Sequence, residues 1–391
     1  MRTPHFAATT TGPAAPLSVV IGAGGTGGHI YPGLALADAL RRAVPDAVIS
    51  FVGTTRGLEG RLIPEAGYRL HTVDMIPFDP ALGARRYLLP AALLKSGAQC
   101  RTILREQRAQ VAVGMGGYPS APVILGARMA KLPSVIHESN AVPGRANQFA
   151  ARLTPNVTVA FDRSCAHLSG GEHARTVGMP IAAALARLDR TALRAEARRE
   201  LGVPDGARLV LFNGGSLGAA RLTEAAVGLA ERWRGRGDVH LLIKTGPAAL
   251  DETRRLLGDF PVARAVPYLD RMDYAYAAAD LVVCRAGSAT VAELASTGVP
   301  AVLVPYPHAP GDHQTHNARV LSDAGAGLLL PDAETTASRL AALIEPLLAD
   351  PARLASMSGA ADPGPHAHAA ELLAAEVIEL AHHRRHLEHA A

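Results

Sequence analysis

The sequence is poor in cysteine and has no long apolar run, and each shortage excludes a class of protein. Its three cysteines, Cys100, Cys165 and Cys284, lie far apart and form no CxxC pair. We therefore expect neither a disulfide framework nor a zinc site, and the count favours a reducing compartment. No run of about 18 apolar residues is present to form a membrane-spanning helix. Residues 1–16 lack the apolar core of a secretory signal, so we expect a flexible tail there.

The charges of the chain nearly balance, which speaks against a nucleic-acid partner. The 391 residues include 39 Lys and Arg against 35 Asp and Glu, a formal net charge of +4. So small an excess over this length does not form the basic surface that nucleic-acid binding requires. Aromatic residues make up only 4% of the chain, but hydrophobic residues make up 48%, enough to fill sizeable cores. A disordered chain is therefore excluded. At roughly 150 residues per domain, the length predicts two to three domains.

Short apolar runs alternate with helical patterns along both halves of the chain. In the first half, LSVVI at 17–21 leads into GAGGTGG at 22–28 and then into a helical pattern, and the same order restarts with RLVLF at 208–212. Such alternation is typical of βα units built on a parallel sheet. We therefore predict the α/β class, with two Rossmann-like, doubly wound domains. Further strands are expected at 48–52, 111–113, 134–137, 239–243, 281–284 and 301–304, and helices at 58–65, 121–129, 219–233 and 290–296.

Breaks in this pattern divide the chain. The sequence Gly178-Met-Pro180 interrupts it, so a first domain is expected at 17–180 and a second at 181–365. After a further break at 362–365, a pattern rich in Ala, Leu and Glu predicts a C-terminal helix and tail at 366–391. The sequence leaves open which half this helix packs against.

Three glycine-rich loops follow predicted strands, at 22–28, 114–117 and 213–218. Glycine lets the backbone turn sharply and approach a ligand, and the N–H groups at a strand-to-helix junction attract phosphate. One such loop is equally well explained as a tight turn, but three in two similar sheets favour a phosphate-containing ligand. None reads GxxxxGK[ST], so a P-loop is not supported. The second strand ends Phe51-Val-Gly-Thr-Thr, without the acidic residue that would bind the ribose of a nicotinamide cofactor.

The most informative segment is CRAGSATVAELA at 284–295. It runs from a loop into a helix, where Ser288 and Thr290 can cap the first turn and free N–H groups can bind an oxyanion. We expect Glu293 in the first turn, on the same side, where its carboxylate could accept hydrogen bonds from two neighbouring hydroxyls, as on a ribose. The alternative is that Glu293 only interacts with the helix dipole.

Taken together, these motifs resemble the MurG family of bacterial glycosyltransferases. The resemblance extends in order from about residue 18 to 331, and it rests on GGTGGHIYPGLALADAL at 24–40, GMGGYPSAP at 114–122, HESNAVPGRAN at 137–147, GGSLGA at 214–219, CRAGSATVAELASTGVPAVLVPYPH at 284–308 and HQTHNA at 313–318. It implies the GT-B plan, in which two Rossmann-like domains face a cleft. It also implies an inverting transfer of GlcNAc from UDP-GlcNAc to lipid I, which is undecaprenyl-diphosphoryl MurNAc-pentapeptide. The product, lipid II, serves peptidoglycan synthesis.

The resemblance further implies which residues contact the substrates. From the first, acceptor-binding domain, the donor or the diphosphates would be approached by Thr26, Gly27, Gly28 and Asn140. From the second domain, UDP-GlcNAc would be held by Ser216 at the diphosphate, Leu269 at the uracil, Gln314 at the sugar, and Ser288, Ala289, Thr290, Val291, Ala292 and Glu293 at the α-phosphate and ribose. No metal or other cofactor is implied, because loop N–H groups and helix ends can offset the diphosphate charge.

An inverting transfer also needs a base for the acceptor hydroxyl and charge stabilisation for departing UDP. His29 follows the first glycine loop, and an imidazole titrates near neutral pH, so we predict it as the catalytic base. Orienting a phosphate and a purely structural role are its alternatives. Glu138 is the second candidate, either for proton removal or for holding the base, and a structural strand-end carboxylate is the alternative there.

Three positions depart from the family pattern. Leu217 stands where the family has Gln, Thr223 where Asn is common, and Ala182 where an Arg often faces the diphosphate. Loss of that cation removes a charge-assisted contact worth about 1.5–3 kcal/mol. These departures raise an alternative, a MurG-like paralogue that uses another UDP-sugar or another lipid or natural-product acceptor. A non-catalytic protein that binds lipid intermediates is a further alternative, and the N-terminal motifs disfavour a UDP-sugar epimerase.

A polyprenyl-linked acceptor stays in the lipid, so the resemblance implies a peripheral protein at the cytoplasmic face of the bacterial cell membrane. The segment Ala81–Arg105 mixes basic side chains with leucine and isoleucine, which could lie on a surface of anionic lipids. An ordinary amphipathic helix with a solvated face explains the pattern equally well. Pro90 interrupts the segment, so we expect two short helices in place of one.

Overall fold

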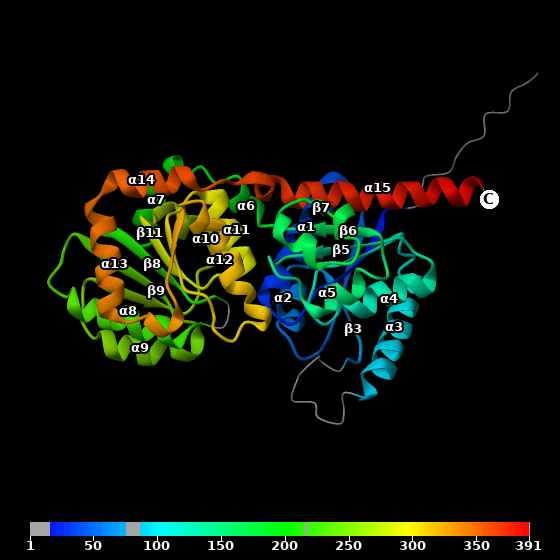
Figure 1. Ribbon diagram of the computed structural model, residues 1–391, viewed down its shortest axis with the longest axis horizontal. Coiled ribbons are helices and arrows are strands. Elements are labelled where there is room, and N and C mark those ends of the chain that lie inside the picture. The colour runs from blue at the N-terminus through cyan, green and yellow to red at the C-terminus, as the bar shows by residue number, and fades with distance from the viewer. Residues whose placement is uncertain (1–15, 76–86, 216–217, 391) are drawn as a thin grey trace, which may run out of the picture.

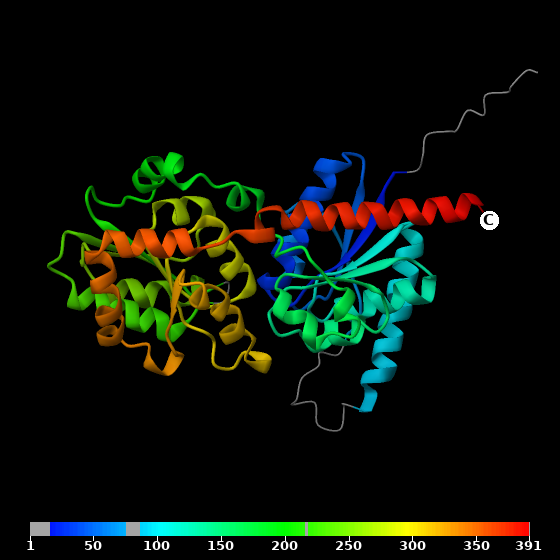
Figure 2. The same cartoon turned by 45° about the horizontal axis from the view of Figure 1, so that its top comes forward.

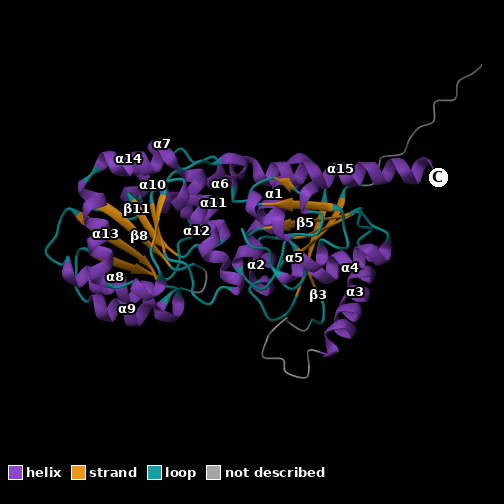
Figure 3. Cartoon of the chain, in the orientation of Figure 1, coloured by secondary structure: helices purple, strands orange, loops and turns teal. Residues whose placement is uncertain are grey.

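The protein consists of two lobes that lie side by side (Figure 1). The structure is a computed structural model that describes residues 16–75, 87–215 and 218–390. Each lobe is a parallel β-sheet with helices packed on it (Figure 3), which confirms the predicted α/β class with two Rossmann-like domains. The tail predicted at 1–16 lies, except for Pro16, outside the described residues.

The first lobe is a seven-stranded sheet with the order β3-β2-β1-β4-β5-β6-β7. Its strands are β1 (Ser18–Gly22), β2 (Val48–Gly53), β3 (Arg69–Thr72), β4 (Val111–Gly114), β5 (Ser134–Glu138), β6 (Asn156–Val159) and β7 (Arg175–Thr176). Its helices are α1 (Gly27–Ala43), α2 (Glu59–Glu65), α3 (Leu89–Glu106), α4 (Ser120–Ala130) and α5 (Arg145–Ala150). All neighbouring strands are parallel, so each connection crosses over the sheet.

The second lobe is a six-stranded parallel sheet with the order β10-β9-β8-β11-β12-β13. Its strands are β8 (Arg208–Asn213), β9 (Val239–Lys244), β10 (Ala263–Val266), β11 (Leu281–Cys284), β12 (Ala301–Leu303) and β13 (Gly327–Leu329). The helices that follow the first lobe are α6 (Ala183–Ala186), α7 (Arg190–Glu200), α8 (Ala220–Arg232), α9 (Leu250–Leu257), α10 (Met272–Ala278), α11 (Ser288–Thr297), α12 (His313–Asp323), α13 (Ala337–Ala349), α14 (Pro351–Ala360) and α15 (Ala369–Ala390).

The central strands form because both of their faces are covered. All five residues of β1 are buried, and so are all but the first residue of β8, as expected for strands of a parallel sheet. Separate buried clusters form on the two faces of the second sheet, one with Leu209 and Leu211 and the other with Val210 and Phe212. The alternation along a single strand thus builds two cores, which hold the sheet between two helical layers.

The C-terminal helix α15 leaves the second lobe and packs on the first (Figure 2). Its buried residues Leu373, Val377 and Ala381 recur at helical spacing and join the core that contains α1. At its start, Glu371 pairs with Arg42 of α1 at 3.1 Å. The sequence left the partner of this helix open, and the structure assigns it to the first lobe.

The chain therefore passes between the lobes twice, and the two crossings touch. The Met179 N–H donates to Nδ1 of His366 at 2.9 Å. Gly178 has a φ of +81°, and a Cβ there would come within 2.6 Å of the Pro365 backbone. Only glycine fits this close approach of two backbones. The domain boundaries at 180 and 365 fall at these crossings and stay predictions.

The expectation of two short helices around Pro90 stays a prediction. The residues after Pro90 form a single helix, α3, which has 18 residues and Pro90 in its first turn. A proline is tolerated there, since the first N–H groups of a helix have no partner within it. Part of the predicted segment, residues 81–86, lies outside the described residues. No helix in the described part of the chain is both long and apolar enough to cross a membrane.

Candidate active site between the two lobes

The strand order reverses once in each sheet, and ligands of open parallel sheets bind at such points. In the first sheet the reversal lies between β1 and β4, which lead into the glycine loops at 22–28 and 114–117. In the second it lies between β8 and β11, which lead into the loop at 213–218 and into α11. The lobes meet near these loops, where the hydroxyls of Tyr31 and Tyr268 are 2.6 Å apart. The candidate site is therefore the region where the carboxyl ends of the two sheets meet.

Thr26, Gly27 and Gly28 lie where β1 passes into α1. Thr26 is exposed and precedes the helix, and its side chain caps no N–H group. Because α1 starts at Gly27, the N–H groups of its first turn lack side-chain partners, and the positive end of the helix dipole lies there. This arrangement suits residues that approach a phosphate.

A buried carboxylate that the sequence analysis missed holds the first glycine loop. Glu59 is fully buried, and its oxygens accept hydrogen bonds from the N–H of Gly25 at 2.9 Å and the N–H of Thr54 at 3.0 Å. The Thr54 hydroxyl adds a third bond at 2.7 Å. Gly25 has a φ of +88°, so the loop conformation depends on both the glycine and its acidic partner. An acidic residue opening a short helix is the only sequence signal of this role.

His29, the predicted base, lies in the first turn of α1 against the second glycine loop. Its Nδ1 is 3.4 Å from the Thr26 hydroxyl, and a Cβ at Gly116 would come within 2.7 Å of its ring. Burial is the main cause that lowers the pKa of His29 to about 4, and the charge of His313 on the second lobe acts in the same direction. The imidazole is therefore neutral near pH 7 and is able to accept a proton or a hydrogen bond.

Glu138, the second candidate base, holds a loop. It is 2% exposed at the end of β5. Its Oε1 accepts from the Asn140 N–H at 2.8 Å and the Asn140 amide at 3.3 Å, and its Oε2 accepts from the Gly144 N–H at 3.1 Å and the Asn147 amide at 3.0 Å. Burial raises the pKa of Glu138, and these donors act in the opposite direction. With four donors on two oxygens, the geometry favours positioning of the 139–144 loop over proton removal.

Asn140 reaches the second lobe through Asn317, another residue that the sequence analysis did not assign. The Asn317 side chain is fully buried on α12. Its Oδ1 accepts a hydrogen bond from the Ala141 N–H at 2.8 Å. Its Nδ2 donates to the side-chain Oδ1 of Asn140 and to the backbone oxygen of Ala286, both at 3.2 Å. One amide thus joins the loop after β5 to the loop after β11. Only the position of Asn317 within the HQTHNA motif pointed to it.

On the second lobe, α11 begins at Ser288, directly after Gly287. No side chain caps this end, so the first-turn N–H groups of Ser288, Ala289 and Thr290 have no partner within the helix. The Val291 N–H already donates to the Gly287 oxygen at 3.0 Å. Val291 and Ala292 are fully buried and pack the helix. The free N–H groups that could bind an oxyanion therefore belong to Ser288, Ala289 and Thr290. Nothing in the geometry favours contact of Val291 or Ala292 with a substrate.

Glu293 lies in the second turn of α11, so its predicted place in the first turn was wrong. The expectation overlooked that the helix already starts at Ser288. The Tyr276 hydroxyl donates to its Oε2 at 2.8 Å. Burial raises the pKa of Glu293 to about 7, while the Tyr276 hydroxyl and the charge of Lys244 lower it. The alternative role, an interaction with the helix dipole, requires a carboxylate in the first turn of the helix. The carboxylate of Glu293 is instead half-buried in the second turn and is held by the Tyr276 side chain of α10.

The remaining predicted donor contacts belong to other segments of the second lobe. Leu269 follows β10 and is 8% exposed, next to the interface residue Tyr268. Gln314 lies in the first turn of α12, where its Oε1 accepts from the N–H groups of Ala286 at 3.2 Å and Tyr306 at 2.9 Å. These bonds orient the amide so that its nitrogen remains able to donate. Ser216, like the neighbouring Leu217, lies outside the described residues.

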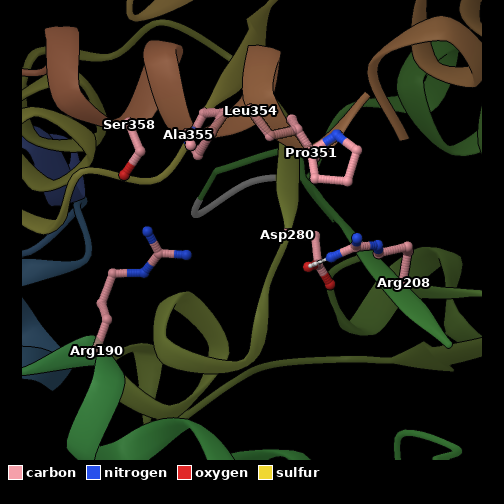
Figure 4. A pocket seen from close by; sticks show the side chains of 8 residues that line it. Arg190, Arg208, Asp280, Pro351, Leu354, Ala355 and Ser358 are labelled. Carbon is pink, nitrogen blue, oxygen red and sulfur yellow. Dashed lines mark hydrogen bonds and ion pairs between the residues drawn. The ribbon is translucent and has the colours of Figure 1, made fainter. Parts of the chain in front are cut away.

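An open hollow lies at the opposite end of the second sheet (Figure 4). It is lined by Arg208 at the start of β8, by Asp280 just before β11, and by Arg190. Arg208 pairs with Asp280 at 3.0 Å, and Arg190 donates to three backbone oxygens. Because these charges serve the protein itself, we assign no ligand to the hollow. Within the described residues, no group of three or more His, Cys, Asp or Glu side chains could hold a metal ion.

Comparison with known proteins identifies the family. The glycosyltransferase family 28 N-terminal domain matches residues 19–159, and the C-terminal domain of that family matches residues 209–376. The Saccharopolyspora erythraea UDP-N-acetylglucosamine–N-acetylmuramyl-(pentapeptide) pyrophosphoryl-undecaprenol N-acetylglucosamine transferase is 44% identical over 93% of this chain and 94% of its own length. The crystal structure of Acinetobacter baumannii MurG matches with a TM-score of 0.72 and 28% identity, over 93% of this chain and all of the other. The chain belongs to the MurG family.

Further comparisons agree with this membership. The Mycobacterium tuberculosis transferase of the same name is 42% identical over 93% of this chain and 89% of its own length. The two matched family domains correspond to the two lobes, and the interval between them contains the boundary predicted at residue 180. The resemblance inferred from the motifs is confirmed, and the roles of individual site residues in this MurG family member stay proposals.

Proposed function

We propose that this protein is an inverting glycosyltransferase that moves GlcNAc from UDP-GlcNAc to lipid I, giving lipid II for peptidoglycan synthesis. The observation that carries the proposal is 44% identity, over 93% of the chain, to a relative named for transfer of N-acetylglucosamine to an undecaprenol-linked acceptor. The site geometry supports it, because unpartnered N–H groups lie at the starts of α1 and α11, where the two lobes meet.

In this proposal the second lobe holds the donor. The first-turn N–H groups of α11 take the α-phosphate, and Glu293 accepts hydrogen bonds from the ribose hydroxyls. Leu269 lies against the uracil, and the amide nitrogen of Gln314 donates to the sugar. Ser216 is proposed for the diphosphate by resemblance alone. The positive helix end offsets part of the charge that develops on departing UDP.

The first lobe supplies the base and the acceptor side. The acceptor oxygen bonds to the anomeric carbon as the bond from that carbon to the diphosphate oxygen breaks, and the electron pair leaves with UDP. The acceptor proton passes to the His29 imidazole, which is neutral because burial lowers its pKa to about 4. A bound diphosphate beside it would raise that pKa and strengthen the base. Thr26, Gly27 and Gly28 guide the diphosphate, and Glu138 shapes the loop that carries Asn140.

A transfer assay tests the proposal. Purified protein is given a lipid I analogue in detergent with UDP-GlcNAc, UDP-glucose or UDP-GalNAc, and both UDP release and the glycosylated product are measured. We expect product with UDP-GlcNAc, and UDP release only when the acceptor is present. Acceptor-independent consumption of UDP-GlcNAc, or no binding and no consumption of it, would refute the transferase assignment.

A second candidate is a MurG-like paralogue with another donor or acceptor. The observation that favours it is Ala182, which is exposed just before α6 where a family Arg would face the diphosphate. Leu217, the other motivating departure, lies outside the described residues. In the same assay, exclusive use of a UDP-sugar other than UDP-GlcNAc would favour the paralogue, and a preference for UDP-GlcNAc with lipid I would exclude it.

We also propose that the protein docks as a peripheral protein on the cytoplasmic face of the bacterial membrane through the first turns of α3. Helix α3 projects from the first lobe (Figure 2), and exposed apolar side chains gather near its start, with Leu88 57% exposed and Leu94 59% exposed. Basic residues follow along the same helix, among them the exposed Arg105. Apolar and basic side chains together suit a surface of anionic lipids.

Vesicle co-sedimentation tests the docking surface. Leu94→Glu places a charge on the proposed surface, and Leu256→Glu is the matched control on α9 of the second lobe, where the leucine is 47% exposed. We expect Leu94→Glu to reduce the fraction bound to phosphatidylglycerol-containing vesicles severalfold, and Leu256→Glu to leave it unchanged. Equal binding of both variants and the unmodified protein would exclude this surface.

A further inference from the structure

Lys244 is a buried cation at the carboxyl edge of the second sheet. It ends β9 opposite Asn213, the last residue of β8, and is 8% exposed. Its Nζ donates to Oδ1 of Asn213 at 3.3 Å and lies 5.1 Å from the centre of the Tyr268 ring. Among the described residues, no acidic side chain forms an ion pair with it. Because burying an ammonium without an acidic partner is costly, this charge points to a partner outside the chain.

Two arginines at the same edge already have an acidic partner. Arg285 follows β11 and pairs with Asp332 at 2.6 Å, and Arg221 in the first turn of α8 pairs with the same carboxylate at 3.1 Å. Arg285 also donates to two backbone oxygens. An ammonium has three N–H donors, and Lys244 uses one of them within the described part of the chain. Of these three cations, Lys244 is therefore the one that remains available to a ligand.

The hydrogen bond to Asn213 connects Lys244 to the third glycine loop. The same Oδ1 of Asn213 accepts from the Gly215 N–H at 3.1 Å, which fixes the start of the loop. The end of the loop packs on the residue after Lys244, because Gly218 has a φ of +77° and a Cβ there would come within 2.5 Å of the Thr245 backbone oxygen. Both ends of the loop are thus held at the end of β9, where the ammonium lies.

The start of α11 approaches the same place. The Asn213 backbone oxygen accepts from the Arg285 N–H at 3.3 Å, shortly before α11 begins. A Cβ at Gly215 or at Gly287 would meet no atom of the described residues within 4 Å, so both backbones are open to a ligand. An anion bound there would meet the ammonium and the free N–H groups of α11 together. Burial lowers the pKa of Lys244, and a neighbouring anion would raise it again.

We propose that Lys244 supplies the positive charge that binds the diphosphate of the donor nucleotide, beside Asn213 and the start of α11. The inference rests on the proposed UDP-GlcNAc site. It adds a cation to that site, since the other phosphate contacts proposed on the second lobe carry no formal charge. A charge-assisted contact is roughly twice as strong as a neutral one, so Lys244 should provide much of the affinity that comes from the phosphates. The same charge would stabilise UDP as it departs.

The readout is the ratio of the Kd for uridine to the Kd for UDP, measured by calorimetry, with uridine in competition against UDP. Both ligands share the nucleoside contacts, so the ratio isolates the phosphates. We expect Lys244→Met to raise the Kd of UDP by about tenfold or more and to leave that of uridine unchanged. Lys244→Gln keeps a donor for Asn213 without the charge and should behave like Lys244→Met. Lys244→Arg keeps the charge and should retain most of the ratio.

Two controls make the result specific. Lys131→Met is the matched variant, because Lys131 is exposed after α4 in the first lobe, and it should leave the ratio unchanged. Thermal unfolding without ligand shows whether each variant is folded. Since Lys244→Met removes an unpaired buried charge, we expect it to be at least as stable as the unmodified protein. Should it fail to fold, Lys244→Gln carries the test.

Three results would contradict the inference. An unchanged ratio in the neutral variants would show that the charge does not act on the phosphates. A ratio that Lys244→Gln keeps and Lys244→Met loses would assign the effect to the hydrogen bond with Asn213. Equal weakening of uridine and UDP would place the effect on the nucleoside or on packing. The proposed function fails separately, if the unmodified protein binds neither UDP nor UDP-GlcNAc, or binds UDP no more tightly than uridine.

Discussion

Glu138→Gln distinguishes a structural carboxylate from a catalytic base. The carboxylate of Glu138 accepts four hydrogen bonds, two on each oxygen. Glutamine keeps one acceptor oxygen and directs an NH2 group at two of the former donors. Hydrogen bonds to a charged group are worth about 1.5–3 kcal/mol each. The smaller cost of burying a neutral side chain offsets part of the loss, so we expect a decrease of about 2–4 kcal/mol in unfolding free energy.

The assay combines urea unfolding with steady-state kinetics at neutral pH. Glu200→Gln is the control, because Glu200 is exposed at the end of α7. If Glu138 positions the 139–144 loop, the urea midpoint of Glu138→Gln falls, and KM for the acceptor rises more than kcat falls. If Glu138 removes the proton, stability stays near that of the unmodified protein and kcat falls by at least about 100-fold. The second pattern would refute the reasoning from hydrogen-bond saturation.

Three other predictions use the same assays. His29→Gln should lower kcat, measured as UDP release, by at least about 100-fold, whereas the control His167→Gln, at an exposed histidine, should leave kcat unchanged. An unchanged kcat in His29→Gln would exclude His29 as the base. Asn317→Ala breaks three hydrogen bonds, so the free energy of unfolding measured in urea should fall by about 1–3 kcal/mol. An unchanged free energy of unfolding would mean that these bonds do not hold the lobes together. Burial lowers the pKa of His366 to about 4, below the unfolded value of about 6.5. As the pH falls, His366 takes up a proton in the unfolded chain before it does so in the folded protein. The free energy of unfolding should therefore fall by about 2 kcal/mol from pH 7 to pH 5, and this decrease should be smaller in His366→Gln.

Apart from β6, the central strands could be predicted from the sequence, whereas the edge strands could not. Strands such as β1 and β8 read as continuous apolar runs because both faces are covered. The strands β3 (RLHT), β7 (RT) and β10 (ARAV) are short and contain charged residues that remain exposed at the sheet edge. Their pairing is determined by the neighbouring strand, which no local pattern records. The same holds for α15, whose apolar stripe fits either lobe until the tertiary contacts are known.

The backbone positions of the proposed site could be predicted from the sequence, whereas the roles of its residues stay predictions. The glycine loops and the start of α11 lie at strand-to-helix junctions, as their residue types indicated. The residues that support them were missed. Glu59 is distant in sequence from Gly25. Lys244, which donates to Asn213 at the start of the third glycine loop, is one charged residue at the end of an apolar strand. Such partners are brought together only by the packing of separate elements.

Several of the bonds that join the lobes come from residues beside the proposed substrate contacts. Tyr31 lies two residues after His29 on α1, and its partner Tyr268 directly precedes Leu269. Asn317 joins the loop of Asn140 to the one that enters α11. A substrate that moves the loop of Asn140 or the loop that enters α11 must therefore also change the bonds between the lobes. The free energy of these bonds then contributes to the binding free energy of the substrate. Because each bond contributes only about 1 kcal/mol, substrate binding can exchange these contacts without disturbing either core, and small movements between the lobes are expected during each transfer.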